Sequence, residues 1–193
     1  MHHDRSGSAP ASGEASTHNV FFGLFPDAQT RVRMAAAVES LQAATGVQGR
    51  WLKPERYHLT LHFLGTFSGL PQPLTDAAQK AAATIRVPPF AVEIDRAGHF
   101  PGGIGWLGCD ATDAGLRSLH DALHAALAQA GVATQGHARF TPHVTVLRAA
   151  HRPLPARPVP SIAWRVREFL LIDSRLGAGS DYRTLGRWPL MPE

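Results

Sequence analysis

A pattern of four residues occurs twice in this sequence, once in each half of the chain. The copies are HLTL at positions 58–61 and HVTV at positions 143–146. In each copy a histidine and a threonine alternate with two aliphatic residues, which is typical of a β-strand with one buried face. We therefore predict two equivalent strands that bury their aliphatic residues and present an imidazole and a hydroxyl side by side on the opposite face.

The segments around these copies predict a mixed fold in which the second half of the chain repeats the plan of the first. A first helix is expected to begin after Asp27 and to end at Gly46, and apolar residues recur at helical spacing in two later segments. A proline-rich segment, 152–160, is expected to be a loop. The expected strands lie at residues 19–25, 56–65, 90–98, 104–109, 141–148, 169–176 and 182–190. Short connections between them favour an α+β fold with antiparallel sheets over a doubly wound parallel fold.

Length and composition predict one folded domain, residues 19–193. The chain has 193 residues, of which 44% are hydrophobic, and this is enough for one substantial core. Residues 1–18 are rich in Ser, Ala and Gly and lack apolar periodicity, so we expect a disordered tail that includes His18. The sequence shows no signal-peptide pattern and no apolar run of membrane-spanning length, and its single cysteine, Cys109, fits a reducing compartment. We therefore expect a cytoplasmic monomer with no membrane partner.

The charge of the chain favours a local anion site. Lys and Arg together number 19 against 15 for Asp and Glu, which gives a formal net charge of +4. The basic residues are scattered, with no run of five or more. A protein that holds duplex nucleic acid by bulk charge is therefore less expected than one with a pocket for a single phosphate.

Two imidazoles and two hydroxyls suit displacement at phosphorus. Histidine titrates near neutral pH, so one imidazole can accept a proton from the attacking oxygen while the other donates one to the leaving oxygen. The hydroxyls of Thr60 and Thr145 can donate hydrogen bonds to the non-bridging oxygens as charge builds on them. The residues alone do not decide which histidine is the acid. This chemistry requires no metal, and we expect no cofactor.

Three other interpretations are open at this point. One is coincidence, because a single His-x-Thr sequence is common, although two copies in matching positions argue against it. Another is a metal site made by His58, His62 and His143, although it would leave the two threonines without a role. The third is a non-catalytic RNA or nucleotide binder, which has no need of two correctly spaced imidazoles.

Paired His-x-Thr-x motifs are the signature of the 2H phosphoesterases, and the chain resembles their RNA 2′,3′-cyclic phosphodiesterase branch, also called 2′-5′ RNA ligase-like. The resemblance covers about residues 19–190, and its blocks are 50–67, 98–109, 139–148 and 171–190. It implies a bilobal α+β fold in which two pseudo-symmetric lobes of antiparallel sheet, with flanking helices, each contribute one motif to a central groove.

The resemblance also implies an activity. Similar proteins hydrolyse the 2′,3′-cyclic phosphate at an RNA end to a 2′-phosphomonoester. They use the first histidine as proton donor to the leaving 3′ oxygen and the second as proton acceptor from water, which assigns these roles to His58 and His143. Related proteins also join RNA ends through a 2′-5′ bond, or act on another cyclic phosphate or oligonucleotide. The implied partner is thus an RNA or oligonucleotide with a cyclic phosphate end.

Two further basic residues are candidate phosphate contacts. The resemblance points to Arg148, although strict alternation places it on the opposite face from His143, so a β-bulge or a strand end is needed. His62 is expected by alternation to share a face with His58 and to contact RNA phosphate when protonated, or else to be a solvated residue at the edge.

Three aromatic residues near the motifs are candidates for stacking on nucleobases. They are Tyr57, Phe100 and Trp106. Aromatic residues beside strands are more often part of the core, and the sequence does not distinguish the two interpretations.

Overall fold

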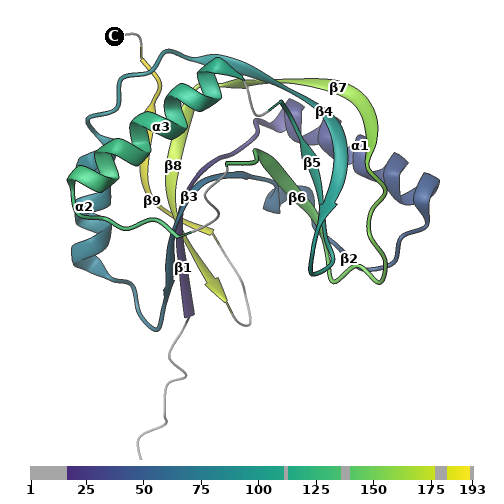
Figure 1. Cartoon of the computed structure of the whole chain (residues 1–193), viewed down its shortest axis with the longest axis horizontal. Helices are drawn as coiled ribbons and strands as arrows, with labels where there is room; N and C mark the ends of the chain where they lie inside the picture. Colours follow the sequence, from purple (N-terminus) through teal and green to yellow (C-terminus); the bar gives the residue numbers. More distant parts are fainter. Residues whose placement is uncertain (1–16, 111–112, 136–139, 177–181, 192–193) are drawn as a thin grey trace, which may run out of the picture.

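The computed structural model describes residues 17–110, 113–135, 140–176 and 182–191, and antiparallel strands dominate this part of the chain (Figure 1). The strands are β1 Thr17–Leu24, β2 Arg50–Trp51, β3 Leu59–Phe67, β4 Phe90–Phe100, β5 Ile104–Gly108, β6 His143–Arg148, β7 Arg157–Val166, β8 Glu168–Leu176 and β9 Tyr182–Pro189. The helices are α1 Ala28–Thr45, α2 Gln72–Ala82 and α3 Ala114–Gln129, with a short 3-10 helix at Pro54–Arg56. The predicted α+β class with antiparallel pairing is confirmed.

The strands form one sheet of nine in which the two motif strands are neighbours. The order is β7-β4-β5-β6-β3-β1-β8-β9, and β2 pairs with the other end of β6. Strands β6 and β3 join the two halves of the sheet, with β7, β4, β5, β6 and β2 on one side and β3, β1, β8 and β9 on the other, and they pair through Leu59 and Val144. Figure 1 shows the two halves on either side of this junction, so each half supplies one motif.

The halves of the sheet are not the halves of the sequence. Strand β1 pairs with β8 through seven residue pairs, from Thr17–Leu176 to Gly23–Leu170, and β9 lies beyond β8. Two strands from the end of the chain thus complete the half that contains β3. The repeat predicted from sequence therefore holds for the two motif strands. It does not hold for the sheet as a whole, because β8 and β9, from the second half of the sequence, belong to the half-sheet that contains β3.

The expected loop at 152–160 is wrong at its end, because β7 begins at Arg157. Pro158 and Pro160 lie within this strand, which pairs with β4 at the edge of the sheet of described strands. Proline cannot donate a hydrogen bond to a sheet but is tolerated in an edge strand. The prolines thus favoured a loop in the sequence analysis, but from Arg157 onward they belong to an edge strand.

The first helix begins and ends as its sequence predicts. The Asp27 carboxylate accepts a hydrogen bond from the Thr30 amide at 2.8 Å, and Gly46 ends α1 in the left-handed region with φ 58°. Its buried residues include Met34 and Val38. Helix α1 packs against β7, α2 against β9, and α3 against β3 and β4.

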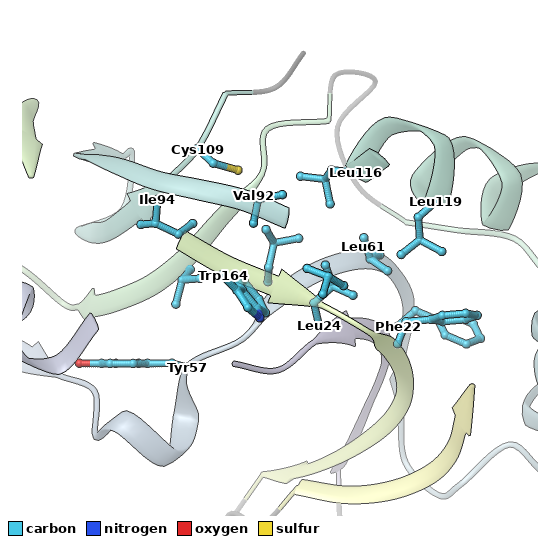
Figure 2. Close-up of a cluster of buried hydrophobic side chains, with 14 of the residues drawn as sticks. Phe22, Leu24, Tyr57, Leu61, Val92, Ile94, Cys109, Leu116, Leu119 and Trp164 are labelled. Carbon is cyan, nitrogen blue, oxygen red and sulfur yellow. The ribbon is translucent and has the colours of Figure 1, made fainter. Parts of the chain in front are cut away.

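One large apolar cluster joins the three helices to one face of the sheet, and Figure 2 shows its centre. The motif residues Leu59, Leu61, Val144 and Val146 belong to it and are at most 4% exposed. Burial of these side chains fixes which face of each motif strand points away from the helices.

The folded region begins earlier than the expected boundary at residue 19. His18 lies in β1 and is buried, and its Nδ1 lies 2.8 Å from the carboxylate of Asp173 on β8. The assignment of His18 to the tail is therefore wrong, because a partner 155 residues away in sequence holds it in the sheet. Residues 1–16, the rest of the expected tail, lie outside the described residues.

Within the described ranges, none of the helices combines the length and the apolar character needed to cross a membrane.

The junction between the half-sheets predicts a stability effect. Val144 is 0% exposed and pairs with Leu59, so Val144→Ala removes buried methyl groups and leaves a cavity where the two halves meet. We expect the free energy of unfolding to fall by about 1–3 kcal/mol, measured by urea denaturation. The matched change Val32→Ala, at a 69% exposed position on α1, should alter it by less than about 0.5 kcal/mol. Equal effects of the two variants would contradict this account of the junction.

Candidate active site

The register at the junction brings four motif side chains together. Because Leu59 pairs with Val144 in antiparallel register, His58 lies opposite Thr145 and Thr60 lies opposite His143. All four residues are partly exposed, whereas the residues between them are buried. Each motif strand thus presents its imidazole and its hydroxyl on one face, as predicted, and the pairing of the two strands brings the two sets together.

Each imidazole is oriented by a carbonyl group two residues earlier in the chain. Nδ1 of His58 lies 2.9 Å from the Arg56 oxygen, and Nδ1 of His143 lies 2.7 Å from the Thr141 oxygen. A carbonyl oxygen can only accept, so Nδ1 carries the hydrogen in both rings. The other nitrogen, Nε2, is therefore left in both neutral rings to accept a proton, as acid–base chemistry requires.

The two rings differ in their aromatic surroundings. Phe21, Phe25 and Tyr182 surround His58, with ring centroids 4.9, 5.5 and 5.3 Å away, and the Tyr182 hydroxyl lies 3.2 Å from its Nδ1. His143 contacts Phe100 edge to face at 4.8 Å. Sequence reasoning missed the three aromatic residues around His58. Phe21 lies on β1, Phe25 directly follows β1, and Tyr182 begins β9. Only the order of the strands in the sheet brings these residues close to β3.

Burial lowers the pKa of both imidazoles. The pKa of His58 falls from 6.5 to about 4, mainly because burial disfavours the charged form, and the positive charges of Arg56 and Arg148 add to the effect. The pKa of His143 is lowered by the same two kinds of cause, burial first and then Arg148. Both rings are thus neutral near pH 7 without a ligand, and an anion placed beside them would raise each pKa again.

A β-bulge brings Arg148 to the face that carries His58 and His143. Between β5 and β6, Trp106 pairs with Thr145 but Gly105 pairs with Leu147, so Val146 is an extra residue. Leu147 is consequently 0% exposed, whereas Arg148 is exposed and lowers the pKa of both histidines. The sequence required a bulge or a strand end here for Arg148 to reach the site, and the structure contains the bulge.

A second bulge removes His62 from that face. Between β1 and β3, Gly23 pairs with Thr60 but Phe22 pairs with His62, so Leu61 is the extra residue. Leu61 and His62 are therefore both buried on the helix side. The prediction that His62 shares a face with His58 is wrong, because alternation fails at the bulge.

His62 packs against α3 instead. It is 6% exposed, its Nε2 lies 2.9 Å from the His120 oxygen, and its ring stacks on the His120 ring at 4.3 Å. Burial lowers the pKa of His62 to about 4. His62 thus does not lie beside His58 and His143 as the metal alternative requires, and no set of three potential metal ligands occurs within the described residues.

Comparison with known families gives one match that spans most of the chain. A family model described as the 2′-5′ RNA ligase superfamily matches residues 27–177. This range contains both motif strands and both bulges.

Individual relatives agree with this match. A protein of Aeropyrum pernix named RNA 2′,3′-cyclic phosphodiesterase is 29% identical over 140 residues, which cover 70% of this chain and 74% of that protein. A Thermotoga maritima protein of the same name is 26% identical over 138 residues, covering 69% and 71%. The crystal structure of E. coli LigT complexed with 3′-AMP has a TM-score of 0.75 and 29% identity, covering 90% of this chain and 98% of that one. The fold class expected from the resemblance is confirmed.

The electrostatics of the site predict where its imidazoles titrate. By NMR titration without ligand, His58 and His143 should both titrate below pH 6.5, and His58 near pH 4. Arg148→Gln removes a positive charge that disfavours both imidazolium forms, so both pKa values should rise. Arg86→Gln, at an exposed position whose charge does not act on either ring, is the control and should leave them in place. A fall or no change in Arg148→Gln would show that Arg148 lies away from the pair.

The burial of His62 predicts a pH-dependent stability. In the unfolded chain this imidazole binds a proton below about pH 6.5, whereas the folded one does so only near pH 4. Its contribution is therefore complete above pH 6.5 and is lost as the pH falls towards 4, by up to about 3 kcal/mol. His62→Leu should reduce the stability difference between pH 7 and pH 4.5 in urea unfolding, while the exposed His151→Leu should not. An unchanged difference in His62→Leu would contradict the buried placement.

Proposed function

This chain belongs to the 2′-5′ RNA ligase superfamily, and we propose that it hydrolyses the 2′,3′-cyclic phosphate at an RNA end to a 2′-phosphomonoester. The observation that carries the proposal is the pair of imidazoles, each oriented through Nδ1 and each keeping Nε2 for proton transfer. Two relatives named RNA 2′,3′-cyclic phosphodiesterase support this substrate over other phosphodiesters. An RNA that ends in a cyclic phosphate is the proposed partner.

The proposed reaction is an in-line displacement at phosphorus. Nε2 of His143 accepts a proton from water as the new P–O bond forms. The P–O3′ bond breaks, and His58 gives its proton to the 3′ oxygen. The roles of donor and acceptor follow the family assignment, and the product keeps its phosphate on the 2′ oxygen.

Substrate binding supplies the charge that the acid needs. The pKa of His58 is about 4 without ligand, so the ring is neutral when the RNA arrives. The cyclic phosphate carries one negative charge, which favours the imidazolium form once the anion lies beside the ring. Binding and proton uptake by His58 are thus coupled. A plot of kcat/KM against pH should be bell-shaped. Both of its limbs should lie at a lower pH than the pKa of an unperturbed histidine.

The remaining site residues are proposed to hold the non-bridging oxygens. The hydroxyls of Thr60 and Thr145 have no hydrogen-bond partner within the described residues, and each lies on the same face as one histidine and opposite the other. Arg148 adds a positive charge close to both rings. Such donors stabilise the charge that develops on these oxygens in the transition state.

The proposal predicts a large loss of rate when either imidazole is removed. His58→Ala and His143→Ala should each lower kcat on a cyclic-phosphate-ended RNA by about 10²–10⁴, because each deletes one proton-transfer group. The double variant should fall far short of the product of the two losses, since the pair acts as a unit. Thr60→Ala and Thr145→Ala should cost less. The exposed His151→Ala is the matched control and should retain full activity.

One assay tests both which product is formed and whether the reaction requires a metal ion. Purified protein is incubated with the RNA in excess EDTA, and the product is identified as a 2′- or a 3′-phosphate. A 2′-phosphate formed in EDTA supports the proposal. Activity that is lost in EDTA and restored by zinc or manganese would overturn the proposed mechanism, as would retention of activity in either histidine variant.

A further inference from the structure

A small apolar cluster, separate from the main core, packs around His58. Its members are Phe21, Leu170 and Ile172, with Phe25, Phe63 and Tyr182 packed against them. Three of its rings contact the imidazole of His58, those of Phe21, Phe25 and Tyr182. The proposed proton donor therefore lies against the aromatic part of an apolar cluster.

This position is unfavourable for an acid, because His58 must carry a positive charge before it can donate a proton. Burial disfavours the charged form, and so do the positive charges of Arg56 in the short 3-10 helix and of Arg148 and His143 in β6. Tyr182 supplies no negative charge, because burial raises the pKa of its hydroxyl. The Arg56 carbonyl oxygen, which accepts from Nδ1 of His58, favours the charged form. The aromatic rings are the other close neighbours of the imidazole.

Two of the three rings lie nearly parallel to the imidazole. The ring of Phe25 is inclined to it by 19° at a centroid distance of 5.5 Å, and the ring of Phe21 by 31° at 4.9 Å. The face of an aromatic ring is electron-rich, and it attracts a cation that lies within about 6 Å of the ring centroid. Both phenylalanines can therefore stabilise the imidazolium form of His58, whereas aliphatic side chains would only bury it.

The same cluster already holds another cation on a ring face. The guanidinium carbon of Arg56 lies 3.9 Å from the centroid of the Tyr182 ring. This ring stands at 82° to the imidazole of His58, and its hydroxyl lies 3.2 Å from Nδ1. Separate aromatic faces thus serve the two cationic groups, with Tyr182 under the guanidinium and the phenylalanines beside the imidazole.

The surroundings of His143 differ in this respect. Among the described residues its ring contacts one aromatic ring, that of Phe100, at 87°. Of the other aromatic candidates for stacking, Trp106 contacts Phe100, and Tyr57 is 2% exposed and part of the core. The nearly parallel rings therefore occur at the histidine that must be charged when the reaction begins, and not at the one that begins neutral.

We propose that Phe21 and Phe25 are positioning residues whose ring faces hold His58 as an imidazolium from substrate binding until proton transfer. This role rests on the proposed hydrolysis and adds what keeps its acid charged. The proton comes from solvent when the anionic cyclic phosphate binds, and it passes to the 3′ oxygen as the P–O3′ bond breaks. The phenylalanines make and break no bond, so their loss should reduce the charged fraction of the acid without removing the acid.

The test is an NMR titration of both histidines in Phe25→Leu, with and without adenosine 2′-monophosphate. Leucine keeps an apolar contact but has no aromatic face. The pKa of His58 should fall by about 0.5–1, and that of His143 should stay in place. On a cyclic-phosphate-ended RNA at pH 7, kcat/KM should fall by the same factor, about 3- to 10-fold. Phe21→Leu should act in the same direction, and Phe25→Tyr, which keeps a ring face, should retain both values.

Phe63→Leu is the matched control. Phe63 belongs to the same cluster, but within the described residues its ring is not one of those that contact His58. Equal pKa values of His58 in Phe25→Leu and Phe63→Leu would overturn the inference and leave the proposed hydrolysis standing, as would an equal fall for His58 and His143. Absence of hydrolysis by the unmodified protein would overturn the proposed function and this inference with it.

Discussion

The site depends on the pairing of two buried residues on neighbouring strands, Leu59 and Val144. They form the recorded residue pair between β3 and β6 and are both 0% exposed. Burial fixes the face that each strand turns to the core, and the pairing fixes the register of one strand against the other. The distance between the imidazoles, and the position of each threonine opposite the other histidine, follow from these two constraints. The geometry of the candidate site is thus set by apolar packing on the opposite face of the sheet.

The two bulges then decide which further side chains reach the site. Each motif has one extra residue directly after its threonine, Leu61 in β3 and Val146 in β6. The next residue in each strand therefore turns to the core, and the two equivalent positions hold His62 and Leu147. Arg148 returns to the face of His58 and His143, where its charge acts on both imidazoles. The bulge in β6 thus places a cation on the face of the two imidazoles, whereas the bulge in β3 turns His62 away from it.

The sequence predicts those features that local chemistry determines. Asp27 and Gly46 bound α1 because capping acts within a few residues, and the motif strands follow from alternation. Alternation fails for His62 because of the bulge at Leu61, and no local sequence signal predicts that bulge. The start of edge strand β7 was not predicted, because its prolines favour a loop. The aromatic residues around His58 were not predicted either, because only the strand order brings them close to this ring. What escapes prediction is long-range pairing, including the pair Leu59–Val144 that brings the two motifs together, whereas the face that the histidine and the threonine share within each motif is set locally.

The pairing of β1 with β8 has a consequence for how the molecule assembles. Strand β1 is made first and β8 almost last, so the half-sheet around β3 stays incomplete until nearly the whole chain is available. Such pairing between distant segments costs loop-closure entropy before it contributes energy, and folds of this kind form slowly. During synthesis on the ribosome, both motifs can be present while β1 still lacks one neighbour. Because synthesis runs from β1 to β9, the candidate active site is one of the last parts of the protein to reach its final structure.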